Sequence, residues 1–173
     1  MTEKTLLLLR HAKSGWDDPS LADFDRPLAM RGREAAPRIG EEMARRGWLP
    51  DLAIVSPAMR TRQTWALVAA SLPRQPDVTY ERAIYEAQLS NILDAVRAVP
   101  ERVSTLLVVG HNPGLEELAA ALAAPESDPD ALARMRAKFP TAALARLTFE
   151  GLWLSLDRHG AILREFIAPA DLA

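Results

Sequence analysis

A short aliphatic run that ends in an Arg-His pair constrains this chain more than any other feature. The run begins at residue 5 and continues to Arg10, and His11 follows directly. Continuous aliphatic runs of this length are typical of strands that are buried on both faces of a parallel sheet. Two further runs, at 52–55 and 105–109, have the same character. The chain is therefore expected to form an α/β sheet, in which ligands bind at the carboxyl ends of the strands.

Helical periodicity alternates with these strand-like runs. Apolar residues recur at helical spacing, and Gly47 follows the first such segment as a helix stop. The pattern predicts helices at 30–46, 58–72, 89–99 and 115–122, and it predicts a short strand at 78–80.

The pattern changes in the last part of the chain. Alternating residues at 142–149 and 161–167 favour two or three closing strands, partly antiparallel. Polar stretches at 12–28, with four aspartates, and at 124–130 are expected to be solvated loops. We therefore predict a single domain over residues 1–173. Its fold would be a three-layer α/β/α sandwich with a mostly parallel central sheet and an antiparallel edge.

Composition narrows the classes of function. The net charge of −2 argues against a nucleic-acid-binding protein, which usually carries a basic excess. The chain has no cysteine, which excludes disulfides, a thiolate nucleophile and a thiolate metal site. Its first aliphatic run is too short to span a membrane, and no signal-peptide cleavage pattern follows it. We therefore expect a cytoplasmic protein with no nucleic-acid or membrane partner.

Four side chains follow the predicted strand ends. Arg10 and His11 follow the first run, Arg60 lies about one turn into the next helix, and His111 follows the run at 105–109. Because the carboxyl ends of parallel strands lie at one edge of a sheet, these side chains are expected to converge. Two arginines and two histidines form a cationic pocket, which suits a phosphoryl group, because its equatorial oxygens carry the charge that is stabilised during transfer.

The same segments resemble the signatures of the histidine phosphatase superfamily, the phosphoglycerate mutase-like proteins. That family has an Arg-His pair after the first strand, and residues 9–14 here read Leu-Arg-His-Ala-Lys-Ser. Residues 27–32 (Pro-Leu-Ala-Met-Arg-Gly), 56–64 (Ser-Pro-Ala-Met-Arg-Thr-Arg-Gln-Thr) and 109–113 (Val-Gly-His-Asn-Pro) resemble further family patterns in the same order. The resemblance covers most of residues 5–122.

This resemblance implies a role for each of the four side chains. His11 would be the nucleophile that takes the phosphoryl group, which gives a phosphohistidine enzyme intermediate. Arg10, Arg60 and His111 would bind the phosphoryl group. No metal and no cofactor are implied.

Four further side chains complete the predicted site. Lys13 and Ser14 follow His11 in the loop and are either phosphate ligands or solvated loop residues. Asn112 is predicted to bind the substrate phosphate as well. Glu86 lies where the family's proton donor is expected, and it is either an active-site acid or a carboxylate at the start of a helix.

Within the superfamily, the chain most resembles the small phosphohistidine phosphatases of the SixA type. Only 50 residues separate Arg60 from His111, so the helical cap that larger members insert there is absent. An open site suits a phosphorylated protein surface better than a buried small metabolite. Since the nitrogen leaving group of phosphohistidine can arrive protonated, the need for a strong general acid is smaller. The resemblance thus implies a metal-independent phosphatase that acts on phosphohistidine in a protein.

Two alternatives remain open. A small-molecule phosphatase would use the same scaffold on a small phosphorylated metabolite. A non-catalytic phosphate or phosphoprotein binder would keep the arginines but gain nothing from an intact His11. A mutase is disfavoured, because it needs a closed site to protect the phosphoenzyme from water. A metal hydrolase is disfavoured, because the histidines come without a carboxylate ligand motif. The oligomeric state is left open.

Overall fold

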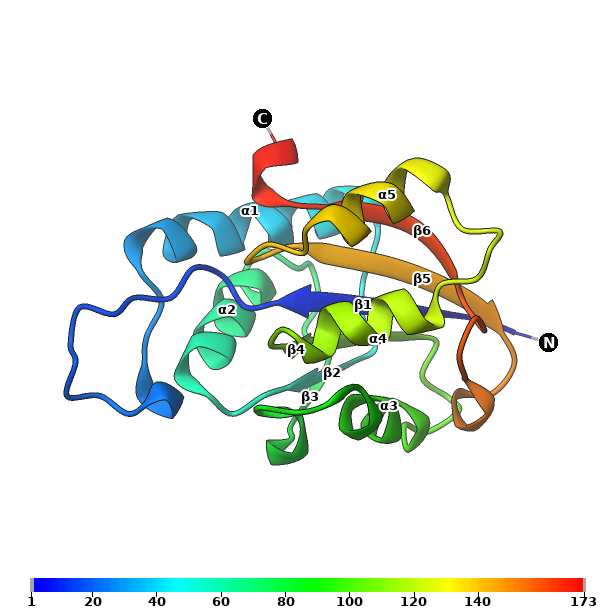
Figure 1. The fold of residues 1–173 in the computed structure, drawn as a ribbon, viewed down its shortest axis with the longest axis horizontal. Coiled ribbons are helices and arrows are strands. Elements are labelled where there is room, and N and C mark those ends of the chain that lie inside the picture. The colour runs from blue at the N-terminus through cyan, green and yellow to red at the C-terminus, as the bar shows by residue number, and fades with distance from the viewer. Residues whose placement is uncertain (1, 173) are drawn as a thin grey trace.

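The computed structural model describes residues 2–172 and consists of a six-stranded mixed sheet with helices on both faces (Figure 1). In chain order the elements are β1 (Glu3–Arg10), α1 (Met30–Arg46), β2 (Leu52–Val55), α2 (Met59–Ala69), β3 (Asp77–Tyr80), α3 (Leu89–Arg97), β4 (Thr105–Gly110), α4 (Gly114–Leu122), α5 (Pro129–Ala137), β5 (Leu144–Glu150) and β6 (Ile162–Ile167). Four short 3₁₀ helices lie at Asp23–Asp25, Arg82–Ile84, Trp153–Ser155 and Pro169–Asp171.

The strand order β3-β2-β4-β1-β5-β6 places the first and fourth strands at the centre of the sheet. β1, β2, β3 and β4 pair in parallel, whereas β5 runs antiparallel to both β1 and β6. The register pairs Arg10 with Gly110, so β1 and β4 end side by side. The residues that follow these two strands therefore leave the sheet next to each other.

The core has two halves, one on each face of the sheet. Leu6 and Leu8 of β1 pack on the side that is covered by α3, α4 and α5, while Leu7 and Leu9 pack under α1 and α2. All four leucines are completely buried. Because both faces are covered, the strand needs apolar residues at every position, which explains its continuous aliphatic run.

The structure confirms the three-layer fold and the predicted elements, with shifts of up to three residues at their ends. Two closing strands, β5 and β6, form the antiparallel edge. The prediction of a loop through 124–130 is wrong at its end, because α5 begins at Pro129. Asp128 caps this helix by accepting a hydrogen bond from the Ala131 amide (2.9 Å). Six of its nine residues are exposed, and its apolar stripe is only Ala131, Leu132 and Met135, too short to reveal a helix by periodicity.

One close contact holds the loop after β1 against α1. Gly32 of α1 lies so near this loop that a Cβ atom would stand 2.2 Å from the Lys13 carbonyl oxygen. The Ala29 amide donates to the same oxygen (2.9 Å). Glycine is therefore required at position 32, and the contact positions the chain just after His11. Among residues 2–172, no helix combines the length and apolar character needed to cross a bilayer.

Candidate active site

The four predicted side chains meet at the carboxyl edge of the parallel strands. The rings of His11 and His111 lie with their centroids 5.4 Å apart. Arg60 lies in the first turn of α2 and is buried. Burial, together with the nearby charges of Arg60 and Arg10, lowers the pKa values of both imidazoles. The convergence that the strand ends predicted is thus present in the structure.

His11 is held in one orientation and one tautomer. Its Nδ1 lies 2.7 Å from the carbonyl oxygen of Ala12, and because a carbonyl only accepts, Nδ1 carries the proton. The Ala12 amide donates to the Thr64 hydroxyl (3.0 Å), which itself donates to the Arg60 carbonyl (2.7 Å). Burial, aided by the charges of Arg60 and Arg10, lowers the pKa of His11 to about 4. At neutral pH, Nε2 therefore carries a lone pair, as a nucleophile requires.

His111 is anchored through its other ring nitrogen. Its Nε2 lies 2.7 Å from the hydroxyl oxygen of Ser56, which is fully buried at the end of β2. Burial and the nearby charge of Arg60 lower the pKa of His111 to about 3, so this ring is neutral too. When the Ser56 hydroxyl donates to Nε2, the proton of His111 resides on Nδ1, which then becomes a donor.

Three buried nitrogens of these four side chains have no hydrogen-bond partner among the described residues. They are Arg10 Nε, Arg60 Nε and His111 Nδ1, and the Nε atom of Arg146 is the only other such side-chain atom in residues 2–172. Buried polar atoms normally have partners, and exceptions call for an explanation. Three unpaired donors beside a neutral histidine form a site for an oxyanion with several oxygens, such as a phosphoryl group.

Asp23 organises the cations of the site, a role that the sequence analysis missed by assigning residues 12–28 to a solvated loop. One carboxylate oxygen accepts from Arg60 (3.0 Å) and from the Tyr85 hydroxyl (2.8 Å), and the other accepts from Arg26 (2.9 and 3.1 Å). Its backbone carbonyl also accepts from Arg60 (2.8 Å). Burial alone would raise the pKa of Asp23, but hydrogen bonds from Tyr85, Arg26 and Arg60 lower it to about 2. Asp23 is therefore an ionised anchor for the Arg60 guanidinium.

Tyr85 connects this anchor to His111 and to Glu86. Its ring packs edge-on against His111, with centroids 5.5 Å apart. Burial, the hydrogen bond to Asp23 and the charges of Asp23 and Glu86 raise the pKa of Tyr85 to about 12. Glu86 itself is exposed and has a left-handed backbone (φ 53°). Glu86 thus follows Tyr85 and lines a hollow with Pro113 and Glu117, and its role as an acid remains a prediction.

The three additional predicted phosphate ligands have different surroundings. Ser14 is buried and its hydroxyl accepts from Arg26 (2.8 Å). The Asn112 side chain donates to the Phe139 carbonyl (2.9 Å), which also accepts from Arg10 (3.0 Å). Lys13 is exposed, and its side chain lines a neighbouring groove. Phosphate binding by these three side chains stays a prediction. Within residues 2–172, no group of three or more His, Asp or Glu side chains is arranged to hold a metal ion.

Comparison with known proteins identifies the family of this chain. The sequence pattern of the histidine phosphatase superfamily (branch 1) matches residues 6–137. The chain belongs to this superfamily. An uncharacterized protein of Mycobacterium tuberculosis is 36% identical over 168 residues, which cover 93% of this chain and 99% of the relative. The fold of the chain is phosphoglycerate mutase-like.

Two solved structures resemble this chain along nearly its whole length. A candidate phosphohistidine phosphatase SixA from Nakamurella multipartitia is 34% identical, with a TM-score of 0.84 and 98% of each chain covered. A second candidate SixA, from Agrobacterium tumefaciens, is 32% identical, with a TM-score of 0.79 and coverage of 96% of this chain and 99% of the other. The predicted resemblance to the SixA-type proteins is therefore confirmed at the level of structure.

Proposed function

We propose that this protein is a metal-independent phosphatase that removes the phosphoryl group from phosphohistidine in a protein through a phosphohistidine intermediate on His11. The observation that carries the proposal is the set of unpaired buried donors on Arg10, Arg60 and His111 beside the neutral His11. These donors match the oxygens of a transferring phosphoryl group, whose charge has to be stabilised in the transition state.

The reaction proceeds in two steps. Nε2 of His11 attacks phosphorus while Arg10, Arg60 and His111 donate hydrogen bonds to the phosphoryl oxygens, and the P–N bond to the substrate imidazole breaks. The imidazole leaves with its electron pair and is neutral if its ring was protonated beforehand. Water then attacks the phosphorus on His11, the second P–N bond breaks with its electron pair returning to Nε2, and neutral His11 is regenerated. Inorganic phosphate leaves with the protons of the water, one of which passes to solvent at neutral pH. Phosphoryl transfer of this kind depends on positioning and charge stabilisation more than on acid catalysis.

Two observations support phosphohistidine as the substrate. Glu86 is exposed, and none of the four converging side chains is a carboxylic acid. An alkyl phosphate needs a proton on its leaving oxygen, whereas a protonated imidazole leaves without one. In addition, two of the structures that this chain resembles are described as candidate phosphohistidine phosphatases.

Hydrolysis of a phosphohistidine peptide, measured beside a panel of phosphorylated sugars and nucleotides, tests the proposal. We expect the peptide to have the highest kcat/KM and His11→Ala to lower its turnover at least ~10³-fold, the scale of lost covalent catalysis. His159→Ala, which replaces an exposed histidine, is the matched control and is expected to retain activity. A chelator should leave the rate unchanged.

Other outcomes would reject specific parts of the proposal. Retention of turnover within about tenfold in His11→Ala would remove His11 as the nucleophile. A higher kcat/KM for a phosphorylated metabolite would make the protein a small-molecule phosphatase. Phosphate binding without any turnover in the native protein would make it a phosphate binder.

A further inference from the structure

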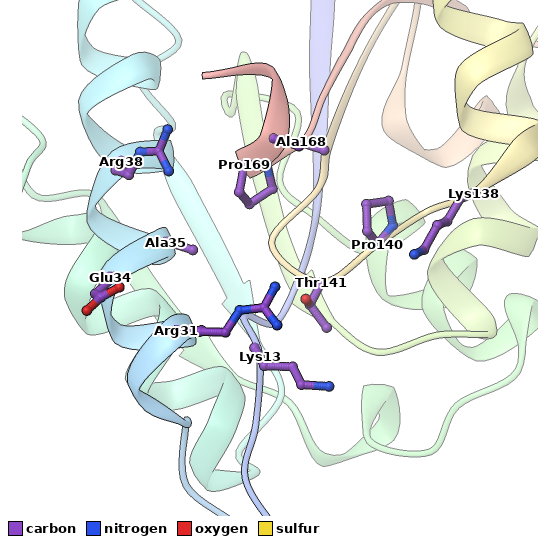
Figure 2. Close-up of a pocket in the computed structure, with 11 residues that line it drawn as sticks. Lys13, Arg31, Glu34, Ala35, Arg38, Lys138, Pro140, Thr141, Ala168 and Pro169 are labelled. Carbon is purple, nitrogen blue, oxygen red and sulfur yellow. The ribbon is translucent and has the colours of Figure 1, made fainter. Parts of the chain in front are cut away.

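A groove beside the catalytic pocket gathers cationic side chains. It has a volume of about 550 Å³ and lies between α1 and the segments 138–141 and 168–170 (Figure 2). Its charged lining residues are Lys13, Arg31, Glu34, Arg38 and Lys138. The whole chain has 23 acidic and 21 basic side chains, so four cations around a single carboxylate are a local feature of this surface.

The groove is joined to the catalytic pocket through the backbone. Lys13 lies two residues after His11, and its carbonyl contacts α1 at Gly32, the neighbour of Arg31. On the opposite wall, the Phe139 carbonyl next to Lys138 accepts from Arg10 of the pocket (3.0 Å). A ligand in the groove would therefore lie immediately beside a phosphoryl group on His11.

Three of these cations are available to a ligand. Within residues 2–172, no carboxylate oxygen lies within 4.0 Å of the side-chain nitrogens of Lys13, Arg31 or Lys138. All three residues are exposed. Figure 2 shows the ends of Arg31 and Lys138 on opposite sides of the groove, directed toward the space between them. Arg38 is engaged differently, since it donates to the Leu172 carbonyl.

We propose that this groove binds an acidic stretch of the protein substrate, next to its phosphohistidine. The inference rests on the proposed function and adds the sequence context that the enzyme selects. Lys13, Arg31 and Lys138 come from three separate segments, so they match several carboxylates along a chain better than one small anion. Ala35, Pro140 and Pro169 add apolar wall, against which the backbone and methylene groups of a peptide pack.

The expected contribution is moderate and depends on salt. Each exposed ion pair is weak, so the preference results from several pairs acting together. The Debye length is about 8 Å at physiological ionic strength, so added salt screens such pairs strongly. The attraction should therefore appear as faster capture of acidic substrates at low salt, with little change in the chemical step.

Two phosphohistidine peptides of equal length test the proposal. One carries Asp and Glu on both sides of the phosphohistidine, and the other carries Asn and Gln at the same positions. We expect the native protein to show about tenfold higher kcat/KM for the acidic peptide at low salt, a difference that diminishes as salt is added. Arg31→Glu and Lys138→Glu, made separately, should each lose most of this preference, while their turnover of free phosphohistidine stays unchanged.

Arg102→Glu is the matched control. Arg102 is exposed and lines a hollow with Leu52 and Asp77, the first residues of β2 and β3, at the opposite end of the strands. Arg102→Glu changes the net charge by the same amount as Arg31→Glu, and it should leave the preference for the acidic peptide intact. Binding of unphosphorylated, fluorescently labelled versions of both peptides provides a readout that does not require turnover, with tighter binding of the acidic peptide expected.

Several results would overturn the groove proposal. One is equal kcat/KM and equal binding for both peptides. Another is a loss of the preference for the acidic peptide in Arg102→Glu as large as that in Arg31→Glu. A third is a bisphosphorylated metabolite that is preferred over both peptides and loses this advantage in Arg31→Glu. If neither phosphohistidine peptide is hydrolysed while a small phosphate ester is, the proposed function fails. The binding measurement still decides whether the groove takes acidic peptides.

Discussion

At the scale of single residues, Arg60 shows why this site needs a guanidinium and not merely a positive charge. Its two terminal nitrogens bind the carbonyl and carboxylate of Asp23, which leaves the buried Nε as the unpaired donor. Lysine keeps the charge but offers no planar fork that can serve both partners. We expect Arg60→Lys to lower kcat/KM about 100-fold, the scale of a lost oxyanion donor. Arg62→Lys, an exposed change on the same helix, should cost little. Equal activities of the two variants would contradict this assignment.

The neutral histidines also predict how stability depends on pH. Burial lowers the pKa of His11 to about 4, whereas an unfolded histidine titrates near 6.5. Between these values the unfolded chain binds a proton that the native protein does not, so stability falls as the pH drops from 6.5 toward 4. From pH 7 to about pH 4.5 the loss due to His11 alone is about 2 kcal/mol.

Urea unfolding at these two pH values measures this loss. His11→Asn should lose less stability on acidification than the native protein, because the substituted residue does not titrate. His159→Asn, at an exposed position, should keep the native loss. If His11→Asn lost as much stability as the native protein, the account of a buried neutral imidazole would be wrong.

At the scale of elements, the contact between α1 and the loop after β1 supports both the fold and the site. A Cβ atom at Gly32 would stand 2.2 Å from the Lys13 carbonyl oxygen, so Gly32→Ala forces the helix and loop apart. We expect a loss of about 1–3 kcal/mol in the free energy of unfolding. Activity should fall as well, since the displaced loop carries the Ala12 carbonyl that orients His11.

Gly47→Ala is the control that separates a loss of stability from a loss of activity. Gly47 ends α1 in a left-handed conformation (φ 73°), and no atom lies within 4 Å of an added Cβ. This variant should lose about 1 kcal/mol of stability, with normal activity in the folded protein. Native stability and kcat/KM in Gly32→Ala would show that the contact is not needed.

The elements also show what the sequence could predict. The strands and the convergence of Arg10, His11, Arg60 and His111 follow from local patterns, because parallel strands bring their ends to one edge. Asp23 has no such pattern. Its partners Arg60 and Tyr85 lie 37 and 62 residues away in the chain, and its role arises only when the loop folds over α2. Similarly, the apolar stripe of α5 is only Ala131, Leu132 and Met135, so periodicity did not reveal this nine-residue helix.

At the scale of the whole molecule, different elements of the fold position different side chains of the site. The two central strands, buried on both faces, hold His11 and His111 side by side. Helix α2 brings in Arg60, and the loop before α1 brings in Asp23. Rigid support of this kind would keep the proposed nucleophile and the proposed donors in a fixed geometry. We propose that His11 accepts the phosphoryl group before water does.

Trapping the phosphoenzyme tests that claim most directly. The native protein is mixed with a phosphohistidine peptide, quenched at alkaline pH, where phosphohistidine survives, and digested for mass spectrometry. We predict a phosphoryl group on His11 within the first turnover, and none in His11→Ala under the same conditions. Rapid release of inorganic phosphate with no label on the protein, or a label on another residue, would contradict the account.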